Sequence, residues 1–399
     1  MFEGKSIILG VTGSISAYKA VEIASKLTQG GIEVDVVMTA SATEFVTPLS
    51  FQSITHRPVH TDMFSPVTDF DIEHVALAER ADVIVIAPAT ANTIARLALG
   101  LADDLLSCTV LSTSAPVILA PAMDVGMYQN QVTQENLERL RSRGYTVVGP
   151  AYGRLASGLE GLGRLAEVGE ILAVIHQVLG RGGDLSGKRL VISAGGTQEP
   201  IDPVRYIGNY SSGKMGYALA EAARNRGAKV TLITAPTAIS PPPGVEVIQV
   251  QTALQMRQAV IDKAAGADAL IMAAAVADYR PQATAGQKIK RKPEKLSIEL
   301  IKTPDILGEI AGDLIKVGFA AESEEVVENA TRKLKEKGLD FIVANDITGA
   351  DSGFSVDTNR VIIIDRDGKV DRLPLMLKSE VAQKILDKLA VRLAGGSSV

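Results

Sequence analysis

Small and hydroxyl-bearing residues follow a strand-like run near the N-terminus, in a pattern that suits phosphate binding. In Ile7-Ile-Leu-Gly-Val-Thr-Gly-Ser-Ile-Ser-Ala, the glycines allow close backbone approach, and Ser14 and Ser16 place hydroxyls at a predicted helix start. Free N–H groups and the helix dipole favour an anion there. The spacing is not that of a dinucleotide-binding fingerprint, so a tight strand-to-helix turn explains this motif equally well.

Three more segments of this kind follow predicted strands. They are Met38-Thr-Ala-Ser-Ala, Ala87-Pro-Ala-Thr-Ala-Asn-Thr and Ala120-Pro-Ala-Met-Asp. Ligands bind at the carboxyl ends of strands in open parallel sheets, so several such segments favour a binding site over plain turns. His74 lies near a predicted helix start, and its neighbours alone favour a surface cap over a catalytic base.

The C-terminal half carries a second dense group of polar residues. The segment from Ser193 to Gly216 is rich in Gly and Ser, and it opens a predicted helix without a Walker A pattern. Its backbone N–H groups could hold an anion, with donors from Asn209 and Lys214. Asp278 follows a later strand, and the basic run from Lys288 comes next. Such a run is usually a solvated loop, but beside these strand ends it predicts a triphosphate clamp.

The elements that must position these residues alternate between strand and helix along the whole chain. This alternation predicts parallel sheets covered on both faces, in two Rossmann-like three-layer α/β domains. We place the domains at residues 1–180 and 188–399. The glycine-rich segment 181–187 reads as a linker between them. Residues 359–365 and 368–373 predict a late hairpin.

Composition narrows the class of protein. The chain has 399 residues, 46% hydrophobic and 22% charged, and a net charge of −5, so the basic excess of a nucleic-acid binder is missing. Its apolar runs are too short to span a bilayer, and no signal peptide is visible. The single cysteine, Cys108, excludes an internal disulfide and fits a reducing cytoplasm. We expect a cytoplasmic protein that binds neither nucleic acid nor membrane.

The N-terminal motifs resemble the homo-oligomeric flavin-containing cysteine decarboxylases over about residues 4–175. The resemblance is carried by Gly13-Ser-Ile, Glu73-His-Val-Ala-Leu-Ala, Ala87-Pro-Ala-Thr-Ala-Asn-Thr and Pro121-Ala-Met-Asp. It implies a flavodoxin-like flavoprotein domain, with His74 as the base and Met123 in the substrate motif. The residues it assigns to FMN are Gly13, Ser14, Ile15, Thr39, Ser41, Thr90, Ala91, Asn92, Thr93 and Ala122.

Two positions depart from that family's pattern. Asp124 stands where the family usually has an Asn that holds the substrate carboxylate, and its charge would repel that carboxylate unless it is protonated or turned aside. Ser157 stands in the substrate clamp where the family often has an acidic Cys. Cys108 lies on another segment and is expected to be a core thiol. These departures do not affect the fold and flavin assignments. They do mean that the family's substrate-clamp details are not carried over to this chain.

The C-terminal half resembles phosphopantothenate–cysteine ligase over about residues 185–390. The matching motifs include Asp202-Pro-Val-Arg-Tyr-Ile, Ala273-Ala-Ala-Val-Ala-Asp-Tyr-Arg and Lys288-Ile-Lys. The resemblance implies that Asn209 acts on an acyl-cytidylate, that Lys288 is catalytic, and that Arg205, Ala273 and Ala274 lie near the substrate. The residues it assigns to CTP are Asp278, Lys288, Pro304, Asp305, Ile306, Leu307, Phe319, Lys333 and Lys337.

Together the two halves resemble the bacterial-type fusion that acts in coenzyme A biosynthesis. The resemblance implies that L-cysteine is joined to 4′-phosphopantothenate with CTP and Mg²⁺, and that the product is decarboxylated with FMN. Which residues contact the metal is unknown. It also implies a homo-oligomer of ligase dimers and decarboxylase trimers, up to a dodecamer. Two alternatives stay open for the N-terminal half, a flavin prenyltransferase and a non-catalytic regulatory subunit.

Overall fold

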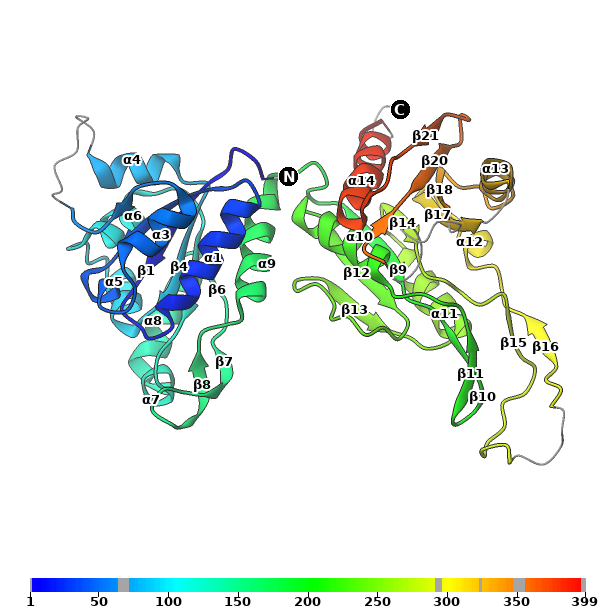
Figure 1. The fold of residues 1–399 in the computed structure, drawn as a ribbon, viewed down its shortest axis with the longest axis horizontal. Helices are drawn as coiled ribbons and strands as arrows, with labels where there is room; N and C mark the ends of the chain where they lie inside the picture. The colour runs from blue at the N-terminus through cyan, green and yellow to red at the C-terminus, as the bar shows by residue number, and fades with distance from the viewer. Residues whose placement is uncertain (1, 64–71, 291–295, 323–324, 347–355, 396–399) are drawn as a thin grey trace. The chain divides into compact units, whose positions relative to one another are not determined.

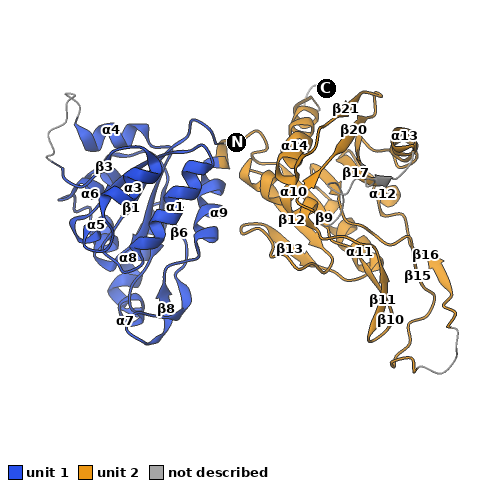
Figure 2. Cartoon of the chain, viewed as in Figure 1, with its two compact units in different colours: residues 1–179 blue, residues 180–399 orange. Residues whose placement is uncertain are grey.

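The chain forms two compact α/β units in a computed structural model that describes residues 2–63, 72–290, 296–322, 325–346 and 356–395. Unit 1 comprises residues 1–179 and unit 2 comprises residues 180–399 (Figure 2). Each unit holds one large sheet with helices on both faces (Figure 1). The prediction of two α/β domains built on parallel sheets is confirmed.

Unit 1 is built on a six-stranded sheet in which every neighbouring pair is parallel. Its strands, in spatial order, are β3 (Val59–His60), β2 (Glu33–Met38), β1 (Ser6–Val11), β4 (Val83–Ala89), β5 (Val117–Pro121) and β6 (Thr146–Val147). The central strands are buried on both faces, which explains their unbroken apolar runs. The strand order reverses between β1 and β4, where a doubly wound sheet leaves its binding crevice.

Two layers of helices cover this sheet. One core packs under α1 (Ala17–Gln29), α3 (Pro48–Thr55) and α9 (Val168–Leu179). The other packs under α4 (Glu73–Arg80), α5 (Ala91–Leu99), α6 (Leu105–Ser112) and α8 (Gln131–Ser142). The remaining elements are α2 (Ala40–Thr43), α7 (Val125–Gln129) and an antiparallel hairpin of β7 (Ala151–Arg154) with β8 (Glu160–Arg164).

Unit 2 repeats the same strand order and extends it. Its sheet runs β13 (Glu246–Gln249), β12 (Lys229–Thr234), β9 (Arg189–Ala194), β14 (Ala269–Met272), β17 (Ile315–Glu322), β18 (Phe341–Asp346), β20 (Val361–Asp365) and β21 (Val370–Arg372). The strands from β13 to β18 are parallel, whereas β20 pairs antiparallel with β18 and with β21. The predicted late hairpin, β20–β21, is therefore confirmed.

Helices cover both faces of this second sheet as well. One core packs under α10 (Lys214–Asn225) and α14 (Lys378–Gly395), and the other under α11 (Ala253–Ala264), α12 (Ile306–Glu309) and α13 (Val326–Glu336). Three two-stranded ladders complete the unit: β10 (Gln198–Asp202) with β11 (Arg205–Gly208), β15 (Tyr279–Pro281) with β16 (Leu300–Lys302), and β19 (Thr358–Asn359) with β22 (Met376–Leu377).

The segment between the two sheets packs on unit 2. A short 3₁₀ turn, Gly180–Gly182, follows α9. Leu185 is fully buried in the core under α10 and α14, and its N–H donates to the carbonyl of Arg226 at 3.2 Å. The residues predicted as a linker, 181–187, thus share contacts with the fold of unit 2.

Candidate functional site

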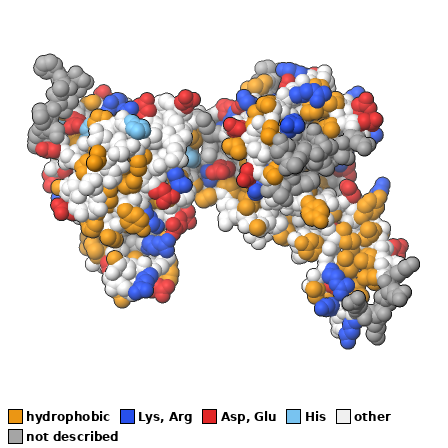
Figure 3. Space-filling view, viewed as in Figure 1, with side chains coloured by type: hydrophobic (Ala, Val, Ile, Leu, Met, Phe, Trp, Pro, Cys, Tyr) orange, Lys and Arg blue, Asp and Glu red, His pale blue; other side chains and the backbone are white. Residues whose placement is uncertain are grey.

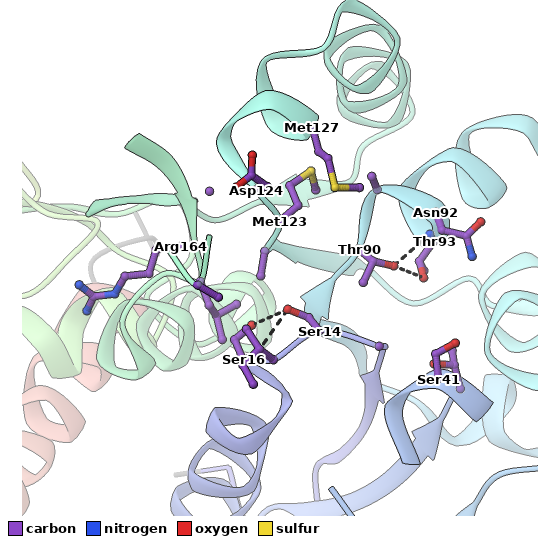
Figure 4. Close-up of a pocket in the computed structure, with 18 of the residues that line it drawn as sticks. Ser14, Ser16, Ser41, Thr90, Asn92, Thr93, Met123, Asp124, Met127 and Arg164 are labelled. Atoms are coloured by element: carbon purple, nitrogen blue, oxygen red, sulfur yellow. Dashed lines mark hydrogen bonds between the residues drawn. The ribbon is translucent and has the colours of Figure 1, made fainter. Parts of the chain in front are cut away.

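A cavity of about 990 Å³ opens in unit 1 at the carboxyl ends of β1, β2, β4 and β5. All the residues assigned to FMN line it, and so do Met123, Asp124 and Ser157. They come from four strand exits and the β7–β8 hairpin. Among the residues labelled in Figure 4, Ser14, Thr90 and Met123 lie around one space. The switch in strand order between β1 and β4 brings these segments together, because the carboxyl ends of parallel strands share one edge of the sheet.

The first strand exit passes unusually close to the second. A Cβ atom on Gly13 would lie 2.4 Å from Cβ of Ser41, so only glycine fits there. Beyond it, the hydroxyls of Ser14 and Ser16 lie 3.0 Å apart just before α1 begins (Figure 4). The side chain of Ser16, the N-cap residue of α1, makes no capping hydrogen bond. This turn therefore offers hydroxyls and helix N–H groups that suit a phosphate.

Hydrogen bonds of threonine hydroxyls fix the position of the segment that follows β4. Thr90 caps α5 by accepting from the N–H of Thr93 at 3.3 Å. The hydroxyl of Thr12, on the first exit, donates to the carbonyl of Pro88 at 2.7 Å and accepts from the N–H of Thr90 at 3.1 Å. Sequence reasoning missed Thr12. Its position one residue before Gly13, at the end of a buried strand, was the available signal.

Several features of this cavity fit a flavin mononucleotide. The hydroxyl oxygen of Thr39 is buried and has no hydrogen-bond partner among the described residues, so a bound ligand could satisfy it. Ile15, Tyr18 and Met127 line the cavity yet are 51–63% exposed, so an aromatic ring system would cover them. The residues present thus offer both a phosphate turn and an apolar wall.

The two residues that depart from the decarboxylase pattern contact each other. The Ser157 hydroxyl donates to the Asp124 carboxylate at 2.6 Å, and the N–H of Gly126 donates to the same carboxylate at 3.0 Å. The Ser157 hydrogen bond, with the second one, lowers the pKa of Asp124 below its ordinary value. Asp124 is therefore ionised near neutral pH and is turned toward the hairpin loop and the start of α7.

His74 lies outside this cavity. It is half-buried in the first turn of α4, and the residues that line the cavity, within the described part of the chain, do not include it. Its neighbour Glu73 contacts Nδ1 of His60 through one carboxylate oxygen, and the other oxygen is buried and has no partner in the described part of the chain. A single chain does not bring the expected base to the flavin residues.

Unit 2 holds a second cavity, of about 510 Å³, beside the exit of β14. It is bounded by α12, β17 and α13. The expected CTP and substrate residues that line it are Ala274, Asp278, Pro304, Asp305, Ile306, Leu307, Phe319, Lys333 and Lys337. The expected residues that do not line it are Arg205, Asn209, Ala273 and Lys288. Lys302 lines it too, and sequence reasoning did not single it out.

Hydrogen bonds fix the backbone around this second cavity. Thr303 donates to the carbonyl of Ala277 at 2.6 Å, and the N–H of Ala277 donates to the buried hydroxyl of Thr197 at 2.9 Å. The Asp305 carboxylate lies 3.1 Å from Nζ of Lys337. The loop that carries Asp278 is therefore held on both sides, and the cavity wall carries the ion pair of Lys337 with Asp305.

The remaining ligase residues lie around the β10–β11 hairpin. The amide of Asn209 donates to the carbonyl of Val276 at 3.1 Å, which ties this hairpin to the loop after β14. Arg205 donates to the carbonyl of Ile289 at 2.9 Å, next to the exposed Lys288. The basic run that begins at Lys288 thus starts beside the hairpin; its residues 291 and 292 lie outside the described ones.

The described residues include one cysteine and no grouped metal ligands. Across the described ranges, no three His, Cys, Asp or Glu side chains are grouped as metal ligands. Cys108 donates to the carbonyl of Ala102 at 3.2 Å, and desolvation raises the pKa of its thiol. It lines neither cavity, but it is partly exposed, so the expectation of a buried core thiol is not met. The helices in the described residues are all too short or too polar to cross a bilayer.

The fold and the sites define a two-domain α/β protein with a cavity at the strand exits of each unit. Residues 1–180 match the family described as Flavoprotein, and residues 185–393 match the DNA/pantothenate metabolism flavoprotein C-terminal domain. The chain belongs to the family of coenzyme A biosynthesis bifunctional proteins, CoaBC. It is a bifunctional enzyme with decarboxylase and cysteine ligase activities.

The relatives cover nearly the whole chain. The protein of Vibrio parahaemolyticus is 44% identical over 97% of this chain and 98% of its own length. The protein of Bacillus subtilis is 44% identical over 98% of each chain. A solved C-terminal domain of a CoaBC protein is 44% identical, covers 53% of this chain and 99% of its own, and has a TM-score of 0.46.

Proposed function

We propose that residues 188–399 join L-cysteine to 4′-phosphopantothenate with CTP, and that residues 1–180 decarboxylate the product with FMN to give 4′-phosphopantetheine. The observation that carries this proposal is the first cavity. It collects every residue assigned to FMN, together with the three assigned to the substrate, from segments far apart in the sequence. A non-catalytic regulatory domain would not need the complete set of FMN and substrate residues.

In unit 1, the turn at Ser14 and Ser16 would hold the phosphate of FMN, and Thr39 and Thr90 would hydrogen-bond to the rest of it. The flavin supplies the redox chemistry of the reaction, and the protein supplies position and proton transfer. Asp124, ionised and bound to Ser157, would orient the hairpin loop instead of holding a substrate carboxylate. Ser157 donates its hydrogen bond to the Asp124 carboxylate, so the proton for the product would come from His74 or water.

His74 remains the proposed base, since histidine suits proton transfer near neutral pH. Because it does not line the cavity of its own chain, the proposal requires an assembly in which α4 of one chain meets the cavity of another. The expected decarboxylase trimers would meet this need, with ligase dimers joining them into a larger homo-oligomer. We place the enzyme in the cytoplasm, where its small substrates are found.

In unit 2, the substrate carboxylate would attack the α-phosphorus of CTP, form an acyl-cytidylate and release pyrophosphate. The cysteine amine would then attack the acyl carbon and displace CMP. Lys333 and Lys337 line the cavity and would bind the triphosphate, with Mg²⁺ neutralising part of its charge. Asn209 and Lys288 would act on the acyl-cytidylate from the β10–β11 side.

Product analysis tests both halves together. The full chain is mixed with 4′-phosphopantothenate, L-cysteine, CTP and Mg²⁺, and pyrophosphate, CMP and CO₂ are measured with the pantothenate products. We expect 4′-phosphopantetheine with equal amounts of CMP and CO₂. Accumulation of the cysteine adduct without CO₂ would leave the regulatory and prenyltransferase alternatives for unit 1. Absence of CMP would contradict the role of unit 2.

A further inference from the structure

The cavity in unit 1 is lined by basic side chains, most of which are already paired with carboxylates. The basic residues on its wall are Lys19, Arg96, Arg154 and Arg164. Lys19 and Arg164 both pair with Glu167, the former at 3.6 Å. Arg96 pairs with Asp103 and also lies 3.5 Å from Asp104. Three of the four cations therefore have a carboxylate partner, although Lys19 and Arg164 share one.

Arg154 is the exception. It is exposed at the end of β7, and its guanidinium makes no hydrogen bond or ion pair with any residue that the structure describes. Its cross-strand neighbour is Glu160, yet the two side chains form no ion pair in this geometry. Lys and Arg side chains, mixed with acidic ones, are visible at the end of unit 1 that carries the β7–β8 hairpin (Figures 1 and 3). Arg154 thus keeps its full charge at the cavity wall.

The hairpin that carries Arg154 is fastened to the site on both strands. On the β8 side, the N–H of Met123 donates to the carbonyl of Gly163 at 2.9 Å, and a Cβ on Gly163 would lie 2.2 Å from the carbonyl oxygen of Met123. On the loop after β7, Ser157 donates to Asp124 at 2.6 Å. These contacts hold Arg154 at the cavity instead of leaving it on a loose surface loop.

We propose that Arg154 binds the terminal phosphate of the decarboxylase substrate, a phosphomonoester. This inference rests on the proposed function of unit 1. A phosphomonoester carries a charge of about −1.5 to −2 at pH 7 and prefers the planar fork of an arginine. The turn before α1, with Ser14 and Ser16, is taken by the flavin phosphate in the proposal. A second phosphate in the same cavity needs another cation. Among the described residues that line the cavity, Arg154 is the basic one without a carboxylate partner.

The test compares ligands that differ only in the phosphate. The full chain and its Arg154→Gln variant are assayed for CO₂ release with 4′-phosphopantothenoylcysteine and with pantothenoylcysteine. We expect Arg154→Gln to lower kcat/KM about 10- to 100-fold for the phosphorylated substrate, mainly through KM, because uniform binding is lost. For the unphosphorylated substrate the two proteins should agree within about twofold. Arg154→Lys keeps the positive charge but lacks the planar guanidinium, so its kcat/KM for the phosphorylated substrate should lie between those of the unaltered chain and Arg154→Gln.

A binding readout and a matched control accompany the kinetics. Titration with 4′-phosphopantetheine and with pantetheine, followed by the flavin absorbance, should show the same selective loss in Arg154→Gln. Arg139→Gln, an exposed arginine on α8 away from the cavity, should change nothing. Equal losses for both members of each pair, or no loss for either, would overturn the proposal. If the unaltered chain releases no CO₂, the proposed function fails, and the titration alone decides on Arg154.

Discussion

The stability of an isolated ligase unit should depend on where the fragment begins, because residues 180–187 pack on unit 2. Leu185 is fully buried between α10 and α14. The guanidinium of Arg226 donates from Nε to Asp184 at 2.9 Å and from Nη1 to Asp387 of α14 at 2.8 Å. The segment is thus joined to the unit by an apolar contact, a backbone hydrogen bond and an ion pair.

The size of the effect follows from these contacts. A fragment of residues 188–399 loses the burial of one leucine, worth about 1.5–3 kcal/mol, and one hydrogen bond from Leu185 to Arg226, worth about 1 kcal/mol. The ion pair of Asp184 is half-exposed and adds no more than about 1 kcal/mol. The fragment should therefore be about 3–5 kcal/mol less stable than residues 180–399. That is a large share of the roughly 5–15 kcal/mol that stabilises a typical domain.

Urea unfolding followed by circular dichroism measures this difference, and CTP-dependent cysteine ligation shows whether each fragment is active. Within residues 180–399, Leu185→Ala should cost about 2–5 kcal/mol, whereas Leu254→Ala, on the surface of α11, should cost no more than about 0.5 kcal/mol. If the two fragments unfold at the same urea concentration and Leu185→Ala does not change the stability of residues 180–399, residues 180–187 are an independent linker and this reasoning is refuted.

Four further substitutions test the two sites. Gly13→Ala, whose Cβ would lie 2.4 Å from Ser41, should purify colourless with ligation intact; a yellow protein would contradict the assigned flavin turn. His74→Asn should retain flavin and ligation but release no CO₂, and normal release would remove His74 from the mechanism. Asn209→Asp should slow consumption of the acyl-cytidylate more than its formation, so rapid quenching should show it accumulating; loss of activation itself would mean the assigned role is wrong. Ser157→Ala should reduce decarboxylation about tenfold or less. Because Ser157 lowers the pKa of Asp124, its removal should raise that pKa. Any loss of decarboxylase activity at acidic pH that is due to protonation of Asp124 should then begin at higher pH. Stalled reduced flavin with released enethiol would instead make Ser157 the proton donor.

Local sequence was sufficient for the fold class and for most of the first cavity. Buried parallel strands are continuous apolar runs, and the small polar residues that end them stand out against those runs. The strand exits at Gly13, Thr39, Thr90 and Ala122 could therefore be expected at one edge of a sheet before their order was known. The hairpin of β20 with β21 followed in the same way from its Asp367-Gly368 turn.

Tertiary structure alone decided the contacts between segments that are distant in the sequence. The two departures, Asp124 and Ser157, are separated by 33 residues, and only the return of the β7–β8 hairpin to the start of α7 makes them partners. The same holds for His74, which the path of the chain places outside the cavity of its own unit. It holds also for Arg154, whose lack of a partner among the described residues depends on where each carboxylate lies. Periodicity and turn residues report on a few neighbouring positions. Strand order, and the side-chain pairs that depend on it, are set by the packing of the whole sheet.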